Sequence, residues 1–371
     1  MRFSLENNTL INIYNKRNNS FDDLRFIFAT LVLYVHSYAL LYGESSTIVD
    51  PFTRLANFQL GLGSLAVYGF FVLSGFFMIQ SLESNNSLIT YAKNRIYRII
   101  PAFWLSLGLA SFVLVPIISD QASIFGFKDG SSLNFFIKAG TFHLVGYAWT
   151  INSVFPINPV VDGINGSIWT LKHEIALYAI LPLIIYLTHQ KKKLLLGVFF
   201  LFLILSIANT VSGFILFNIP CCRGWVFASN EYQSFIVFTV YFFAGVILFK
   251  FRETIIISKR ILFLFITLFL FGMFFGNLKI ISLFTFPYLI IVFGSKFKMK
   301  LFSRTGDYSY GMYIYAFPVQ QTIIHFFKND LNVATLFFAS FIVTLFLSIL
   351  SWHLFEKKIL QMKHKRHTLH V

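Results

Sequence analysis

Ten long apolar runs constrain this 371-residue chain more than any other feature of its sequence. A helix of about twenty mostly apolar residues is long enough to cross the roughly 30 Å hydrocarbon core of a bilayer. Hydrophobic residues make up 57% of the chain and charged residues only 12%, whereas a soluble protein needs charge on about a quarter of its residues to cover its surface. The predicted membrane spans are residues 24–42, 62–82, 96–118, 168–188, 194–216, 233–249, 261–276, 280–294, 308–327 and 332–355. The sequence therefore predicts an all-α, polytopic membrane bundle of about ten helices.

The loops between these runs differ in positive charge. If both ends of the chain lie in the cytoplasm, 23 of the 30 Lys and Arg residues fall in cytoplasmic loops and ends. Cytoplasmic loops of membrane proteins are enriched in Lys and Arg, so the net charge of +15 indicates orientation and not nucleic-acid binding. We expect a cytoplasmic segment at residues 1–20, a membrane domain at 21–356 and a basic cytoplasmic tail at 357–371. The adjacent Cys221 and Cys222 would be strained as a disulfide, and we interpret them as incidental.

An arginine and a histidine share one face of the first predicted span. Arg25 and His36 are eleven residues apart, which is almost three whole helical turns and about 16 Å of rise. Arg25 is then near the cytoplasmic boundary and His36 near mid-membrane. A structural role would have His36 bound to a carbonyl of a neighbouring helix and Arg25 reaching out to the interface. We favour a functional role, because ionisable groups inside a span are costly and a buried His can carry a proton.

Two arginines, Arg95 and Arg98, begin the third predicted span at its cytoplasmic side. A spacing of three residues places them on one helix face. Paired guanidinium groups suit bidentate binding of phosphate. Ordinary anchoring at the cytoplasmic boundary explains the pair equally well, and the sequence does not decide between the two.

A carboxylate, Glu174, follows Lys172 and His173 early in the fourth predicted span. A local ion pair with these two neighbours would give it a structural role. We favour a carboxylate that orients or activates a hydroxyl. By the charge-derived topology it belongs to the outer half of the membrane, opposite the arginines.

Other polar positions carry weaker signals. Ser74-Gly75 could let two helices approach closely, and Asp307 suits the positive start of a helix. The sequence contains no Gly-rich phosphate loop, no Cys/His spacing typical of a metal site and no nucleophile elbow.

Several segments together resemble the acyltransferase 3 family of bacterial membrane O-acyltransferases, in the order expected for that family. They are Phe21-Asp22-Asp23-Leu24-Arg25 with His36, Ala66 to Phe76, Arg95 and Arg98 with Pro101, Trp169-Thr170-Leu171 with Glu174, Tyr178 and Pro182, Ser309 to Tyr313 with Phe317-Pro318, and Glu356-Lys357. The sequence departs from the family pattern at Ala316, where a His is frequent, at Asp23 in place of Gly, and at Lys358 in place of Pro. The SGNH hydrolase-like domain fused to some members has no counterpart, so a separate protein would have to supply it if transfer needs it.

The resemblance implies an enzyme of the bacterial cytoplasmic membrane that moves an acyl group, most often acetyl, from cytoplasmic acyl-CoA to a hydroxyl of a cell-surface or lipid-linked glycan. It implies no permanently bound cofactor and no metal; acyl-CoA is a substrate. The expected partners are the glycan or glycolipid acceptor, the bilayer and the glycan assembly machinery. Carried onto this sequence, the expected roles are catalysis by His36, Arg25 and Glu174, donor binding by Arg95, Arg98 and Arg25, and substrate binding by Asp22, Ser74, Trp169, Tyr178 and Tyr313.

Two questions stay open at this stage. His36 can take a proton from the attacking hydroxyl or can carry the acyl group itself. A glycan or lipid transporter has the same polytopic build, although such proteins often contain internal repeats, and we detect none here. A purely structural or sensing protein would leave His36, Arg25 and Glu174 without a shared purpose.

Overall fold

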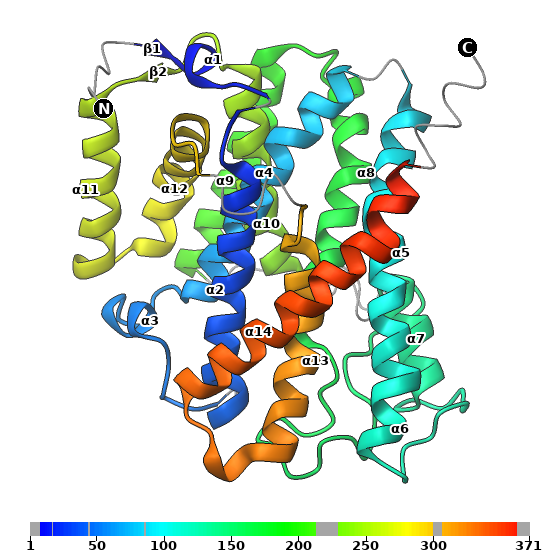
Figure 1. Cartoon of the computed structure of the whole chain (residues 1–371). Helices are drawn as coiled ribbons and strands as arrows, with labels where there is room; N and C mark the ends of the chain where they lie inside the picture. Colours follow the sequence, from blue (N-terminus) through cyan, green and yellow to red (C-terminus); the bar gives the residue numbers. More distant parts are fainter. Residues whose placement is uncertain are drawn as a thin grey trace.

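Helices form at all ten predicted positions in the computed structural model (Figure 1), which describes residues 8–16, 18–43, 45–84, 87–212, 229–299 and 306–361. They are α2 (Phe21–Tyr42), α4 (Leu62–Ser84), α5 (Leu88–Leu109) continued by a π-helical turn (Ala110–Leu114) and α6 (Val115–Ile118), α8 (Leu171–Leu187), α9 (Lys192–Ser212), α10 (Ser229–Lys250), α11 (Lys259–Phe275), α12 (Leu278–Lys296), α13 (Ser309–Phe327) and α14 (Val333–Ser351) followed by a π-helical turn (Trp352–Glu356). Cys221, Cys222 and most of the basic tail lie outside the described residues.

Eight helical segments within the described residues are long and apolar enough to cross a membrane. The two remaining predicted spans correspond to α11, which is shorter at 17 residues, and α13, which is more polar because it carries Gln320 and Gln321. The short elements are α1 (Leu10–Ile13), α3 (Pro51–Leu55), α7 (Ser132–Gly140), 3₁₀ turns at Gly166–Thr170 and Lys328–Asp330, and strands β1 (Asn8–Thr9) and β2 (Ile256–Ile257), which pair antiparallel. The chain is an all-α polytopic membrane protein, as predicted.

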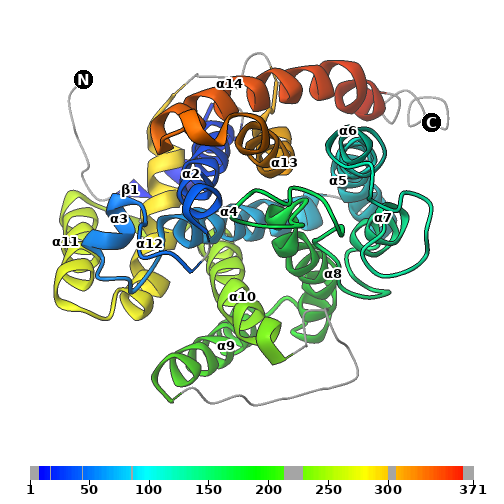
Figure 2. The ribbon, with the colours of Figure 1, turned by 90° about the horizontal axis from the view of Figure 1, so that it is seen from below.

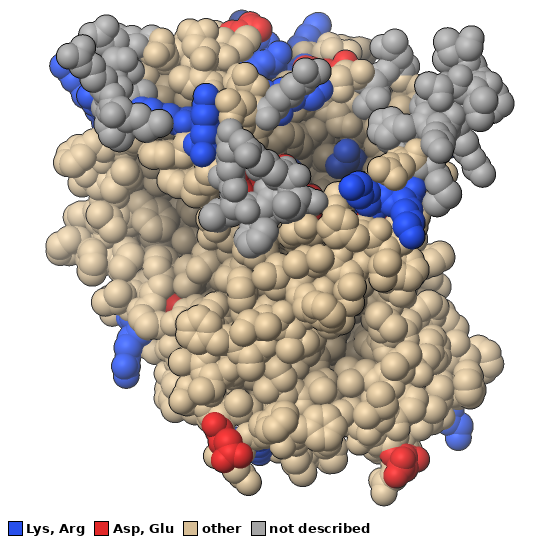
Figure 3. All heavy atoms as spheres, viewed as in Figure 1, with Lys and Arg blue, Asp and Glu red and all other residues tan. Residues whose placement is uncertain are grey.

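Positive charge gathers at one end of the bundle. Figure 3 shows most of the visible Lys and Arg side chains at the end where Figure 1 places α1, β1 and β2, whereas α6 and α7 lie toward the opposite end. The positive-inside rule predicts that the basic end faces the cytoplasm. We therefore call the two ends inner and outer.

Helix α4 lies at the centre of the bundle, in contact with α2, α5, α8, α10 and α12 (Figure 2). It meets α10 with almost no side chain between the two backbones. A Cβ atom added at Gly75 would lie 1.8 Å from the Phe242 carbonyl oxygen, and one added at Gly245 would lie 2.0 Å from the Val72 carbonyl oxygen. Small residues permit such close helix packing in membranes, so the proposed structural role of Gly75 is confirmed.

A proline in α13 fixes the loop that precedes α8. Pro318 has no N–H, so the carbonyl of Ile314, four residues earlier, loses its helical partner. The Asn165 side-chain amide donates to this carbonyl at 2.9 Å, and the Ser106 hydroxyl donates to it at 3.3 Å. An unpaired backbone group inside a membrane costs several kcal/mol, by order of magnitude. The freed carbonyl therefore holds Asn165 against the first half of α13, inside the bundle.

The outer loop before α8 folds back into the bundle. Its residues Ile151, Val154 and Phe155 are fully buried. The Gln321 side chain of α13 donates to the carbonyls of Val160 and Gly163, at 2.7 and 2.9 Å. Because these contacts satisfy the loop's backbone, a non-helical segment can lie at membrane depth inside the protein, and α8 begins well inside the bundle.

Candidate functional site

The inner half of the bundle contains a cavity of about 430 Å³, which is within the usual range for small-molecule sites. Helices α2, α4, α5, α8 and α13 form its walls. It brings together seven of the predicted site residues, namely Arg25, Ser74, Arg95, Arg98, Glu174, Tyr178 and Tyr313. Leu360, close to the end of the described chain, also lines it, so the cavity reaches toward the basic end. We call it the inner cavity.

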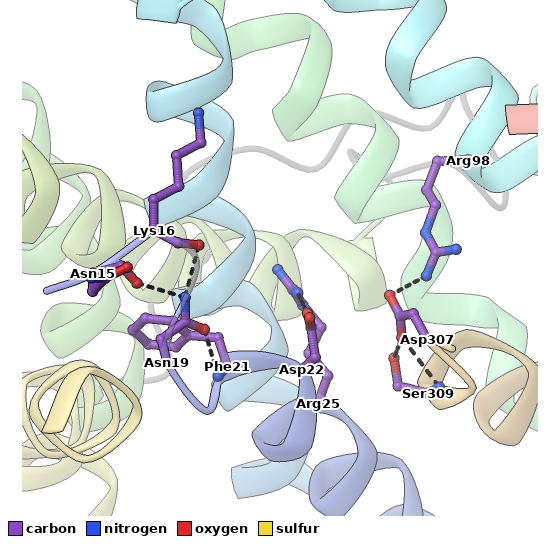
Figure 4. Close-up of polar contacts among 9 residues, drawn as sticks. All are labelled: Asn15, Lys16, Asn19, Phe21, Asp22, Arg25, Arg98, Asp307 and Ser309. Atoms are coloured by element: carbon purple, nitrogen blue, oxygen red, sulfur yellow. Dashed lines mark hydrogen bonds and ion pairs between the residues drawn. The ribbon is translucent and has the colours of Figure 1, made fainter. Parts of the chain in front are cut away.

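Arg98 links three elements at the inner cavity. Its guanidinium pairs with Asp307, just before α13, and with Glu356, whose carboxylate lies 3.4 Å away in the turn after α14. Figure 4 shows Arg98 directed at Asp307, which also accepts hydrogen bonds from the Ser309 hydroxyl at 2.5 Å and N–H at 3.3 Å. Burial raises the pKa of Asp307, but Arg98, then Arg25 and Ser309, outweigh it and hold that pKa below its usual value. Asp307 therefore lies just before the start of α13, as expected, and is also the counter-charge of Arg98.

Arg95 differs from Arg98 although the two share a helix face. It makes no ion pair with any described residue, and its Nε is buried without a hydrogen-bond partner there. A guanidinium with unused donors on a cavity wall is suited to an anionic ligand. Of the two arginines, Arg95 is thus the one whose charge has no carboxylate partner among the described residues.

Arg25 reaches the same cavity from α2. Its Nη1 lies 2.7 Å from the Asp22 carboxylate, and its guanidinium stacks over the Phe77 ring at 4.7 Å (Figure 4 shows the ion pair). Asp22 is half exposed and lines neither cavity described here. Arg25 therefore combines one exposed counter-charge with a fixed position on the cavity wall.

Glu174 is held by two hydroxyl groups. The Ser74 hydroxyl donates to its Oε1 at 2.8 Å, and the Tyr178 hydroxyl donates to the same oxygen. Tyr178 is itself fixed, because Pro182 frees the Tyr178 carbonyl and the Tyr91 hydroxyl donates to it at 3.0 Å. Ser74 thus has a polar role beside the close packing of Gly75.

The expected placement of Glu174 near the outer face, opposite the arginines, is wrong. Glu174 lines the inner cavity together with Arg95 and Arg98. The physical reason is the folded-back loop: Asn165 is bound to Ile314 in the first, inner half of α13, so Glu174, nine positions further along the chain, also lies in the inner half. A sequence reading that starts the span at the outer membrane surface misplaces it.

The local ion pair considered for Glu174 does not form either. Lys172 Nζ and His173 Nε2 each lie 3.0 Å from a carboxylate oxygen of Glu231, which belongs to α10. Both side chains are fully buried. Lys172 and His173 therefore join α8 to α10. Glu174 pairs with neither of them and lines the inner cavity.

A second cavity, of about 520 Å³, lies in the outer half. Its lining includes Gly63 and Ser64 at the outer start of α4, together with the predicted residues His36, Trp169 and Tyr313. His36 Nδ1 lies 3.5 Å from the Ser167 hydroxyl, and the imidazole ring packs edge-on against Phe317. No backbone carbonyl of the described residues binds this ring, so the carbonyl contact considered for a structural role does not form there. We call this space the outer cavity.

The predicted residues therefore separate into two groups, one in each cavity. On α2, Arg25 lines the inner cavity and His36 lines the outer one. Sequence reasoning gave Asp307 and Glu356 no role at Arg98; the only signals were a helix-start pattern and the family's closing Glu-Lys match. It missed Asn165, for which Pro318 four residues after Ile314 was the available signal. Within the described part of the chain, no three His, Cys, Asp or Glu side chains are arranged to hold a metal ion.

Comparisons with known proteins identify the family of the chain. The family model described as an acyltransferase domain matches residues 18–353. An O-acetyl transferase of Shigella phage Sf6 is 28% identical over 355 residues, which cover 93% of this chain and 96% of the phage protein. No solved structure matches the chain. The chain belongs to the acyltransferase 3 family, and it is a membrane acyltransferase.

Proposed function

We propose that the protein moves an acetyl group from cytoplasmic acetyl-CoA, bound at the inner cavity, to a hydroxyl of a cell-surface or lipid-linked glycan at the outer cavity of a bacterial cytoplasmic membrane. The observation that carries the proposal is the pair of cavities: a basic one toward the cytoplasmic end and a polar one with His36 in the outer half. The name of the Shigella phage relative supports O-acetyl transfer. Family membership counts against the alternative of a glycan or lipid transporter.

The donor is an anion, and the inner cavity supplies matching charge. The phosphate groups of CoA suit Arg95, which has unused donors, and Arg25, whose one carboxylate partner is half exposed. Arg98, already paired with two carboxylates, positions the wall on which Arg95 lies. A carboxylate beside the phosphates would repel them, so Glu174 faces another part of the donor. As a hydrogen-bond acceptor, it binds amide N–H groups of the pantetheine arm.

The acceptor hydroxyl is activated at the outer cavity. His36, with its Nδ1 near the Ser167 hydroxyl, takes the hydroxyl proton as the oxygen attacks the thioester carbonyl carbon. A carbon–oxygen bond forms and the carbon–sulfur bond breaks. The proton passes from His36 to the departing sulfur, so that the products are the acetyl ester and free CoA thiol. An acetyl group carried briefly on the ring nitrogen of His36 gives the same products.

The test is transfer by the purified full chain in lipid nanodiscs, with acetyl-CoA and an isolated surface glycan, followed by mass spectrometry of the glycan. His36→Gln should abolish the added acetyl mass while leaving acetyl-CoA binding unchanged. The matched control is His353→Gln, because His353 is exposed, lines neither cavity and, among the described residues, forms a hydrogen bond only with Tyr308, at 3.2 Å. Wild-type transfer by His36→Gln, or no transfer by the wild-type protein, would overturn the proposal.

A further inference from the structure

The two cavities meet at one polar group. Among the described residues that line them, Val67 and Tyr313 face both, and of these two Tyr313 carries a polar side-chain group. Tyr313 is therefore the polar residue at which the described linings of the two cavities adjoin. This inference rests on the proposed function, in which an acetyl group is transferred between the two spaces.

The 3₁₀ turn at Gly166–Thr170 forms the other side of this divide. Ser167 and Trp169 line the outer cavity, whereas Thr170 lines the inner one. The hydroxyls of Thr170 and Tyr313 lie 2.6 Å apart, and both side chains are buried. This hydrogen bond joins the turn to α13 at the boundary between the two cavities.

The divide is fixed by contacts along one face of α13. Asn165 donates to the Ile314 carbonyl, next to Tyr313. A Cβ atom added at Gly166 would lie 2.6 Å from the ring of Phe317, one turn further on. The turn is therefore tightly seated against α13, and the position of the Tyr313 hydroxyl is set before any substrate binds. Fixed hydrogen-bond donors of this kind stabilise charge that develops during acyl transfer.

We infer that the Tyr313 hydroxyl donates a hydrogen bond to the carbonyl oxygen of the acetyl group at the junction of the cavities, where the oxygen gains negative charge during transfer. Thr170 donates to Tyr313 and so leaves the phenol hydrogen directed at the substrate. Tyr313 keeps its proton throughout. Negative charge forms on the carbonyl oxygen as the new carbon–oxygen bond is made. The carbonyl double bond forms again as the carbon–sulfur bond breaks and its electron pair leaves with the sulfur, which takes the proton from His36. Tyr313 is then a catalytic residue, and Thr170 is its positioning residue.

The test compares Tyr313→Phe with Tyr315→Phe in the full chain in nanodiscs. Tyr315 lies on the same helix, bonds to Ser351 at 3.2 Å and lines neither cavity. Tyr313→Phe should lower kcat about 100-fold, with the Kd for acetyl-CoA and the Tm unchanged. Thr170→Val should lower kcat by a smaller factor, because the phenol remains, and Tyr315→Phe should leave kcat at the wild-type value.

Each outcome separates the inference from its basis. Wild-type kcat in Tyr313→Phe, together with an inactive His36→Gln, overturns the role of Tyr313 and leaves the proposed function intact. If Tyr313→Phe lowers kcat but also weakens acetyl-CoA binding and lowers the Tm, the role of Tyr313 is structural only. That result also overturns the inference. If the wild-type protein transfers no acetyl, or His36→Gln transfers it normally, the proposed function fails and this inference fails with it.

Discussion

The inner and outer cavities hold polarity in different ways. The inner cavity is lined by three arginines and by the carboxylates of Glu174 and Asp307. In the described part of the outer cavity, polarity comes mainly from hydroxyl, amide and imidazole groups, with Lys279 as its one cation. Charged walls suit a phosphorylated donor, whereas uncharged hydrogen-bonding walls suit a glycan hydroxyl. The difference indicates a protein that handles two chemically unlike molecules from opposite sides of one divide.

A second contrast, between two neighbouring arginines, exists within the inner cavity. Arg98 has two carboxylate partners, and Arg95 has none among the described residues. One guanidinium therefore stabilises the bundle while its neighbour, one turn away, is available to a ligand. Substituting each in turn separates the two functions of the charge.

The largest effect on stability is expected from Arg98→Ala. It leaves the Asp307 and Glu356 carboxylates without their counter-charge, and Glu356 is almost fully buried. Removing one partner of a buried ion pair costs about 3–5 kcal/mol, and we expect about 2–3 kcal/mol here because Arg98 and Asp307 are partly exposed. The measurement is the Tm of the purified protein in detergent.

A double variant tests the cause of that loss. Arg98→Ala with Asp307→Asn removes a negative charge along with the positive one, so it should recover part of the lost Tm. If Arg98→Ala leaves the Tm at the wild-type value, the ion pairs contribute nothing to stability and the contrast with Arg95 is lost.

The contrast between the two arginines could not be read from the sequence. Asp307 and Glu356 are 209 and 258 positions away from Arg98, so only the folded bundle brings them together. The membrane helices, by comparison, were predictable because hydropathy over about twenty residues is a local property. Bounds were less predictable: α5 begins at Leu88, eight residues before the predicted span, because polar residues there still fit a helix.

Arg95→Ala should weaken donor binding and leave stability unchanged. A charge-assisted hydrogen bond contributes about 1.5–3 kcal/mol, so the Kd for acetyl-CoA should rise about 10- to 100-fold. Arg95→Lys should recover part of the affinity, because it keeps the charge but lacks the planar fork. Isothermal titration of each variant with acetyl-CoA measures this. Wild-type affinity in Arg95→Ala, or a fall in Tm like that of Arg98→Ala, would remove the distinction.

The depth of Glu174 shows a second limit of sequence reasoning. Span prediction assumes that a helix begins at the membrane surface, but the loop before α8 enters the bundle and is held by Gln321 and by the carbonyl that Pro318 frees. These contacts join segments about 150 residues apart. The residue types of the site were therefore predictable, while their division between two cavities was not.

The smallest expected effect concerns the divide itself. Asn165→Ala removes the amide that binds the Ile314 carbonyl at 2.9 Å and leaves only the longer bond from Ser106. The expected loss is about 1–2 kcal/mol, measured as a fall in Tm. The divide should also loosen, so that acetyl-CoA is hydrolysed faster when no acceptor is present.

Pro318→Ala shows whether the freed carbonyl is the reason. Alanine at this position supplies an N–H to the Ile314 carbonyl, so Asn165→Ala should cost less in a Pro318→Ala background than in the wild-type chain, with a coupling of about 1 kcal/mol. Asn158 is the matched control, because it binds Gln321 and not Ile314, and its substitution by Ala should add to Pro318→Ala without coupling. Additive losses for Asn165 as well would mean that the proline does not hold the loop. The separation of the two cavities would then depend on the packing of Gly166 against Phe317 and on the hydrogen bond between Thr170 and Tyr313.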